Sequence, residues 1–181
     1  MLNNTKKLNE GICSDKNSNC NHFISTELSR VAVNNYSIYL VRHAEKTNNA
    51  ENPSLTSCGK RRAEMLANML SKTNITSIYS TSYQRTMQTS KPLADLNNRP
   101  IKIYNPKQLD QLALILQQKH ENTLVVGHSN TTPQLVELLT NQKIPPLTEQ
   151  DFQYLYQVHF VNEQPLLTIF QLPLNCLVTL N

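Results

Sequence analysis

The sequence places a histidine two residues after each of two short apolar runs. Residues 36–41 lead into Arg42-His43, and residues 123–126 lead through a glycine into His128. An imidazole can act as a nucleophile or a proton donor, and a guanidinium fork matches the oxygens of an anion. Either pair alone could equally be the solvated end of a strand.

A strand-like run, residues 75–80, is followed by Arg85 at the start of a helical pattern. A cation in the first turn of a helix is unfavourable to the helix dipole, which favours a functional reason for Arg85. Ligands of open α/β sheets bind at the carboxyl ends of the strands. If the three runs are neighbouring strands, two histidines and two arginines meet in one pocket, and such a pocket suits a phosphate dianion.

The elements that must position these groups follow from the pattern of apolar residues. Strand-like runs alternate with segments whose apolar residues recur at helical spacing, which predicts an α/β protein. We predict three α/β/α layers, with a mostly parallel central sheet and a C-terminal antiparallel hairpin. The predicted strands are 36–41, 75–80, 101–104, 123–126, 152–161 and 166–171. The predicted helices are 57–71, one from about Ser82 interrupted near Pro92, 107–120, and one that Thr132-Pro133 begins.

The first 34 residues differ from the rest of the chain. They are rich in Asn, Ser and Lys and show no clear period, so we predict a polar tail. The catalytic domain is then expected over residues 35–181. Within it, the polar segment 45–53 is expected to lie over the pocket as a loop.

Composition limits the classes of function. The chain has 181 residues and a net charge of +4, which fits anionic substrates. No basic run or recognition-helix pattern supports nucleic acid as a partner. No apolar run approaches the length of a membrane span, and residues 1–22 lack the apolar core of a secretory signal. We therefore expect a cytoplasmic protein without a membrane partner, with export as the alternative; oligomeric state is not indicated.

The four cysteines are Cys13, Cys20, Cys58 and Cys176, and none forms a CxxC pair. Free thiols in a reducing compartment are the simplest interpretation. A zinc site at Cys13, Cys20 and His22 is the alternative, but the spacing is poor and a fourth ligand is not evident. We predict no metal and no other cofactor.

Four motifs in this order resemble the histidine phosphatase superfamily, the phosphoglycerate mutase-like group, over about residues 36–172. The chain's length is similar to that of small phosphohistidine-phosphatase-like members. The motifs are Arg42-His43, Leu55-Thr-Ser-Cys-Gly59, Ser80-Thr-Ser-Tyr-Gln-Arg-Thr-Met-Gln-Thr89 and Gly127-His-Ser129. Each motif alone is weak, whereas four in order are specific.

The resemblance implies a role for each pocket residue. His43 would be the nucleophile, and Arg42 and Arg85 would bind the phosphoryl oxygens and stabilise the charge of the transition state. His128 would donate a hydrogen bond to a phosphoryl oxygen. Weaker candidates for auxiliary phosphate contacts are Asn48 and Ser129.

The sequence departs from the family pattern near both histidines. Ala44 stands where a glycine usually follows the nucleophile, and Ser129 stands where the acid-phosphatase and phytase branch has an aspartate. That branch is therefore disfavoured. The general acid is expected at Glu45, two residues after the nucleophile, or at Asp110. Because neither is firmly placed, we expect a preference for leaving groups that depart without a proton, namely phenolates and imidazoles.

The resemblance and the residues together predict a metal-independent phosphatase acting through a phosphohistidine intermediate. Its substrate would be a phosphomonoester or phosphohistidine, carried by a small molecule or by a phosphoprotein. The alternative is a catalytically silent protein of the same fold that binds phosphorylated ligands.

Overall fold

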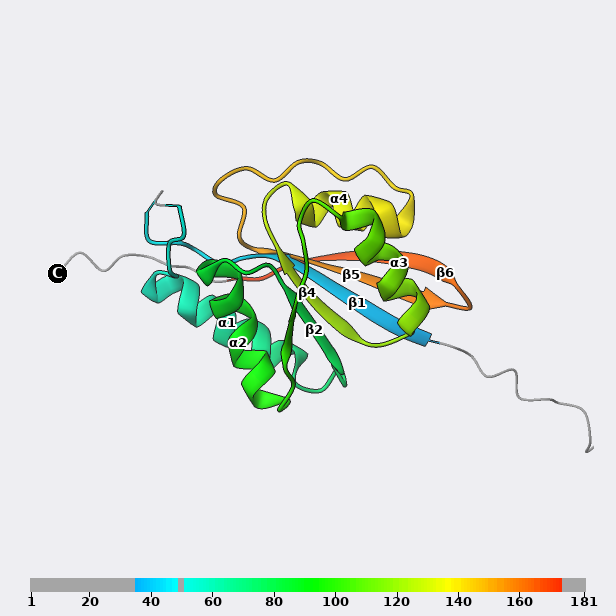
Figure 1. Cartoon of the computed structure of the whole chain (residues 1–181), viewed down its shortest axis with the longest axis horizontal. Helices are drawn as coiled ribbons and strands as arrows, with labels where there is room; N and C mark the ends of the chain where they lie inside the picture. Colours follow the sequence, from blue (N-terminus) through cyan, green and yellow to red (C-terminus); the bar gives the residue numbers. More distant parts are fainter. Residues whose placement is uncertain (1–34, 49–50, 174–181) are drawn as a thin grey trace, which may run out of the picture. The chain divides into compact units, whose positions relative to one another are not determined.

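The computed structural model describes residues 35–48 and 51–173. They form one six-stranded sheet with two helices against each face (Figure 1). The strands are β1 Asn35–Arg42, β2 Ser77–Ser80, β3 Ile101–Ile103, β4 Thr123–Gly127, β5 Tyr154–Val161 and β6 Gln164–Gln171. The helices are α1 Ser57–Leu70, α2 Gln84–Leu96, α3 Leu109–Lys119 and α4 Thr131–Thr140.

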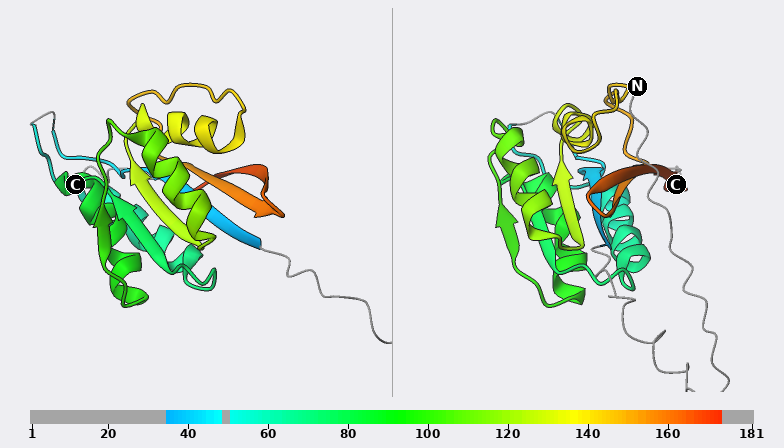
Figure 2. Two further views of the ribbon diagram at one scale, coloured as in Figure 1. Left: turned by 45° about the vertical axis from the view of Figure 1, so that its right-hand side comes forward. Right: turned by 90° about the vertical axis from the view of Figure 1, so that its right-hand side faces the viewer.

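The sheet order is β3-β2-β4-β1-β5-β6. The first four strands run parallel, and β5 and β6 continue the sheet as an antiparallel hairpin. The views in Figure 2 show α1 and α2 on one face of the sheet and α3 and α4 on the other. The predicted three-layer α/β/α fold, mostly parallel with a C-terminal hairpin, is confirmed.

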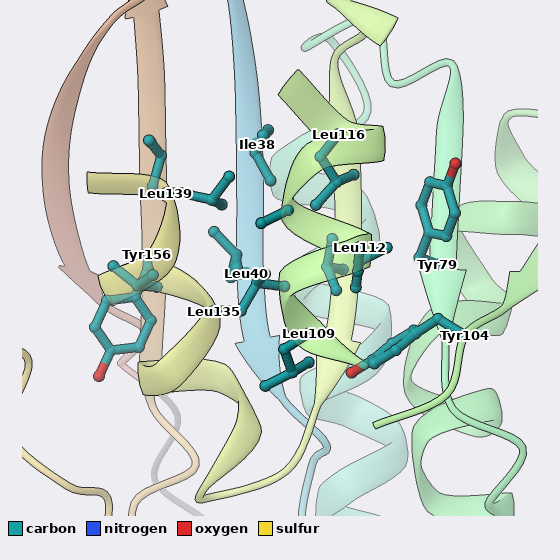
Figure 3. Packing of buried hydrophobic residues seen from close by; sticks show 14 of the residues in the cluster. Ile38, Leu40, Tyr79, Tyr104, Leu109, Leu112, Leu116, Leu135, Leu139 and Tyr156 are labelled. Atoms are coloured by element: carbon teal, nitrogen blue, oxygen red, sulfur yellow. The ribbon is translucent and has the colours of Figure 1, made fainter. Parts of the chain in front are cut away.

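Each face of the sheet carries its own apolar core. Figure 3 shows the cluster in which α3 and α4 meet the sheet, with Leu112 and Leu135 facing Leu40 of β1. The opposite cluster joins α1 and α2 to the same strands through Leu66 and Leu93. Central parallel strands are covered on both faces, so their sequences are continuously apolar rather than alternating. This is why residues 36–41 and 123–126 could be predicted as strands.

The central strands β1 and β4 are direct parallel neighbours, with Arg42 opposite Gly127. The histidines therefore leave the sheet side by side, one residue after this pair. Their alignment is fixed by the strand register, because both strands are buried along their length and a slip by one residue would turn every side chain to the other face.

Two details of the helices differ from the prediction. Helix α2 continues through Pro92 to Leu96 rather than breaking there, because tertiary packing of Leu93 and Ala94 holds the second half in place. Helix α4 begins at Thr131, one residue before Thr132, which the prediction placed at its start. The Thr131 hydroxyl accepts a hydrogen bond from the backbone N–H of His128 at 2.9 Å, which ties the helix start to the strand end.

Cys58, the one cysteine among the described residues, is disulfide-bonded, so the expectation of free thiols is wrong for it. Spacing along the chain does not show which cysteines meet in space, which is why the sequence missed this bond. The predicted tail, residues 1–34, and the zinc alternative at Cys13, Cys20 and His22 lie outside the described residues. Over residues 35–48 and 51–173, no helix is long and apolar enough to cross a membrane.

Candidate active site

The ends of β1 and β4 bring two imidazoles together. The backbone N–H of His43 donates to the carbonyl oxygen of Gly127 at 2.9 Å, which extends the strand pairing by one residue. The His43 and His128 ring centroids are 5.7 Å apart, and the rings meet edge to face. At this separation the rings are in contact, so a group bound against one imidazole also lies near the other.

His43 is held in one orientation by its own backbone. Its Nδ1–H donates to the carbonyl oxygen of Ala44 at 2.8 Å, which leaves the lone pair on Nε2. The N–H of Ala44 in turn donates to the Thr89 hydroxyl at 3.0 Å, so α2 fixes this turn of the chain. Burial, followed by the positive charges of Arg42 and Arg85, lowers the pKa of His43 to about 3. The ring is therefore neutral at physiological pH, as a nucleophile must be.

His128 is oriented through both of its ring nitrogens. Arg85 Nη2 donates to Nδ1 at 3.4 Å, so the proton lies on Nε2, which donates to the Thr81 hydroxyl at 3.0 Å. The Thr86 hydroxyl lies 2.8 Å from that of Thr81 and completes the chain of contacts. Burial and the nearby Arg85 and Arg42 lower the pKa of His128 to about 4. In this tautomer the one N–H of His128 is given to Thr81, so a hydrogen bond from His128 to an anion requires the other neutral tautomer, with the proton on Nδ1 and Thr81 as the donor to Nε2.

The two arginines lie over aromatic rings. The Arg42 guanidinium carbon is 4.4 Å from the centroid of Phe152, and that of Arg85 is 4.4 Å from the centroid of Tyr83. Burial lowers the pKa of both guanidinium groups, yet an arginine stays charged in proteins. The Nε–H of each is buried and has no acceptor among the described residues. Buried donors of this kind are expected to serve a ligand.

These groups line one open cleft of about 460 Å³. Of the predicted site residues, Arg42, His43, Arg85, His128 and Ser129 all face it. Other lining residues are Lys46, Glu51, Pro53, Tyr83, Pro106, Lys107, Asn130, Thr131 and Glu149. Cationic and hydrogen-bonding groups predominate, so the cleft favours a small anion.

Gly127 matters to the cleft because of its position behind His128. A Cβ on Gly127 would lie 2.8 Å from the Thr131 hydroxyl and 2.9 Å from the Thr132 hydroxyl. A side chain at this position would displace these hydroxyls, of which that of Thr131 binds the backbone N–H of His128. The backbone N–H groups in the first turn of α4 add positive potential beside His128.

The structure does not bring Glu45 to the cleft. Its carboxylate instead accepts hydrogen bonds from Arg62, including one of 2.6 Å from Nη2 to Oε1, and both side chains are largely buried. Nearness in sequence to His43 was misleading because the next residues of the chain turn this side chain toward α1. Asp110 is exposed on α3 and is not among the lining residues. Asn48 lines a neighbouring hollow with Lys46 and Phe152 rather than the cleft itself.

We expect Glu45→Gln to act mainly on stability. The change removes a charge from a largely buried ion pair and leaves the Arg62 guanidinium with weaker acceptors, which should cost about 1–2 kcal/mol in the free energy of unfolding. Urea unfolding measures this loss. The matched control is Glu64→Gln, an exposed carboxylate on α1, the helix that carries Arg62. A Glu45→Gln protein that is as stable as the parent, but loses alkyl phosphate turnover, would restore the acid role.

The cleft also contains residues that the sequence did not single out. The ring of Tyr83 stacks on the Arg85 guanidinium. Glu149 forms a salt bridge with Arg42, with 3.2 Å between Oε2 and Nη2. Tyr83 lies inside the motif that runs from Ser80 to Thr89, two residues before Arg85, so its aromatic ring was a recognisable partner for that cation. Glu149 belongs to the loop before β5, and no local pattern connects that loop to β1.

Comparisons with known proteins agree with this geometry. Residues 38–109 match the family model of the histidine phosphatase superfamily (branch 1). A comparison of the sequence with curated proteins found no match.

Solved structures share the fold at low sequence identity. The protein histidine phosphatase SixA, in complex with tungstate, is 18% identical, with a TM-score of 0.64 over 75% of this chain and 96% of that one. A mycobacterial glucosyl-3-phosphoglycerate phosphatase is 11% identical, with a TM-score of 0.62 over 77% of this chain and 100% of that one. A phosphoserine phosphatase from Entamoeba histolytica, in complex with 3-phosphoglyceric acid, is 16% identical, with a TM-score of 0.59 over 76% of this chain and 98% of that one.

Proposed function

We propose that the chain is a member of the histidine phosphatase superfamily, whose family model matches residues 38–109, and that it hydrolyses phosphomonoesters or phosphohistidine without a metal, through a phosphohistidine on His43. The observation that carries the proposal is the state of His43. It is neutral, its Nδ1–H is held by the Ala44 carbonyl, and its Nε2 lone pair is available in a cleft with two arginines.

The first chemical step transfers the phosphoryl group to the protein. Nε2 of His43 attacks phosphorus, the bond to the leaving group breaks, and its electron pair departs with the leaving group. The Ala44 carbonyl accepts the Nδ1–H of His43 and therefore stabilises the positive charge that the ring gains. In the second step, water attacks phosphorus and the P–N bond breaks, which releases phosphate.

The remaining cleft residues act on the transferred group. Arg42 and Arg85 neutralise the charge on the phosphoryl oxygens, and such electrostatic contributions are usually the largest in a site of this kind. When the phosphoryl group takes the contact of Arg85, the proton of His128 moves to Nδ1, which donates to a phosphoryl oxygen while the Thr81 hydroxyl donates to Nε2. Ser129 lies beside it in the cleft and adds an auxiliary hydroxyl, whereas the proposed contact from Asn48 would need the loop to move.

The cleft is open, which fits either a small phosphorylated molecule or a phosphohistidine on a protein surface. The mycobacterial and Entamoeba structures are phosphatases of small phosphate esters by their names, and SixA is a protein histidine phosphatase. The disulfide at Cys58 favours the exported alternative over the cytoplasmic expectation, because disulfides persist mainly in oxidising compartments.

Hydrolysis of p-nitrophenyl phosphate with and without a chelator tests the proposal. Turnover by the parent protein should be unchanged by the chelator. Anion binding without turnover would instead identify the silent phospho-ligand-binding protein of the same fold.

We expect tungstate or vanadate to inhibit competitively, because either oxyanion offers its oxygens to Arg42, Arg85 and His128 as a phosphoryl group does. SixA was itself solved with tungstate. Isothermal calorimetry should show one tungstate site in the parent. Arg85→Ala should weaken binding at least about tenfold, since a hydrogen bond between charged groups contributes about 1.5–3 kcal/mol. Arg61→Ala, an exposed arginine on α1, is the matched control. Equal tungstate affinity in Arg85→Ala would exclude that arginine from the anion site.

A further inference from the structure

Glu149 occupies an unusual place in the cleft, because it is an acid among groups that suit an anion. Its Oε2 lies 3.2 Å from Arg42 Nη2. Its charge also acts on Arg85, since it opposes the lowering of that residue's pKa by burial. The carboxylate is thus within electrostatic reach of both arginines, which a bound phosphoryl group would also contact.

The Glu149 side chain is held loosely, whereas its backbone is fixed. The side chain is 72% exposed, and the Arg42 contact is its one hydrogen bond among the described residues. The preceding carbonyl, that of Thr148, accepts from Arg42 Nη1 at 2.6 Å. Asp151 accepts from the N–H and hydroxyl of Thr148, both at 2.7 Å. The carboxyl group can therefore move away from Arg42 while its backbone stays at the rim of the cleft.

We propose that Glu149 is the carboxyl group that protonates the leaving group, an inference that rests on the phosphatase function proposed above. In the structure the carboxylate is the counter-ion of Arg42. A phosphoryl dianion carries more charge and takes Arg42 for itself. Two negative groups then lie side by side, and a proton held between the carboxyl group and the phosphoryl oxygens offsets their repulsion.

The proton balance of both steps is complete with this group. As Nε2 of His43 bonds to phosphorus and the P–O bond to the leaving group breaks, the departing oxygen receives the proton of Glu149. Glu149 is left as a carboxylate. It then accepts a proton from the water that attacks the phosphohistidine, so that the P–N bond breaks and the carboxyl group is restored.

The other carboxylates near the site fit this role less well. Glu45 is bound by Arg62, and Asp110 lies on the exposed face of α3. Glu51 also lines the cleft, but no contact joins it to either arginine. Glu149 alone among the described carboxylates combines a place in the cleft with a bond to a phosphate-binding arginine.

The test compares leaving groups. Rates of the parent and of Glu149→Gln are measured over a series of aryl and alkyl phosphates whose leaving groups differ in basicity. Loss of a positioned acid should lower kcat/KM for alkyl phosphates about 10²-fold or more, while p-nitrophenyl phosphate, whose phenolate leaves unaided, changes little. The rate should therefore fall more steeply with leaving-group basicity in Glu149→Gln. Glu51→Gln tests whether Glu51, the other carboxylate that lines the cleft, is the acid instead. Glu64→Gln, at an exposed position, controls for the loss of one negative charge.

Tungstate calorimetry gives a readout without turnover. Glu149→Gln removes a competing anion from an exposed ion pair, so the tungstate dissociation constant should fall about two- to fivefold. The acid role of Glu149 is overturned if Glu149→Gln is active and its rate depends on leaving-group basicity as in the parent, or if it loses the same factor on all esters. It is also overturned if the steeper dependence on leaving-group basicity appears in Glu51→Gln instead. If Glu149→Gln binds tungstate more weakly than the parent, Glu149 does not compete with the phosphoryl group for Arg42. A parent inactive on every ester means that the phosphatase function itself fails, and the acid role with it.

Discussion

Replacing His43 with alanine is expected to lower kcat by about 10³-fold or more, because the change removes the group that forms the proposed covalent intermediate. The parent, quenched with denaturant during turnover of a radiolabelled phosphate ester, should carry label that is acid-labile and base-stable, as expected of a phosphohistidine. His43→Ala should carry none. Tungstate binding should persist, since Arg42, Arg85 and His128 remain.

The control is a second histidine on the same sheet. His159 of β5 bonds to the Ser37 hydroxyl at 2.9 Å and does not line the cleft, so His159→Ala should keep its turnover. Circular dichroism establishes that both variants fold. If His43→Ala works at close to the parental rate in a metal-free assay, the nucleophile is another group.

Gly59→Ala is expected to destabilise the protein by about 3 kcal/mol, at the upper end of the usual cost of overpacking. A Cβ on Gly59 would lie 2.3 Å from the carbonyl oxygen of Glu45. That oxygen belongs to the backbone and accepts from the N–H of Thr56 at 2.9 Å, so it cannot rotate away as a side chain could. Either α1 or the turn after His43 must move, and turnover should therefore fall together with stability.

Thermal and urea unfolding measure the first effect, and p-nitrophenyl phosphate hydrolysis measures the second. Ser57→Ala, in the same first turn of α1 but exposed, should change neither by much. Full stability in Gly59→Ala would mean that the helix start and the turn after the nucleophile are not in rigid contact.

The fold could be predicted largely because its signals are local. Buried parallel strands appear as continuous apolar runs, and the stripe of Leu109, Leu112 and Leu116 marks α3 directly. Pro92 was misjudged because the rule that proline ends a helix is also local, whereas the packing that keeps α2 intact is not. The hairpin could be recognised from its two strands, and Asn162 and Glu163 form its turn with positive φ angles.

The site was predictable only in part, for a related reason. Arg42 is the last residue of β1, and His43 and His128 directly follow β1 and β4, so strand adjacency alone brings them together. Glu45 was misplaced because the direction of a side chain after a strand depends on what it meets, here Arg62. Glu149 reaches Arg42 across a gap of over a hundred residues, and nothing in its own neighbourhood indicates this contact.

The pairing of Arg42 with Gly127 also has a consequence for folding kinetics. The two residues are 85 positions apart, and β4 lies between β1 and β2 in the sheet. Contacts between such distant segments form slowly, because a long loop must close before they stabilise the chain. During refolding the helical signal should therefore recover before turnover does, and the rate at which activity returns measures the closure of the central strands.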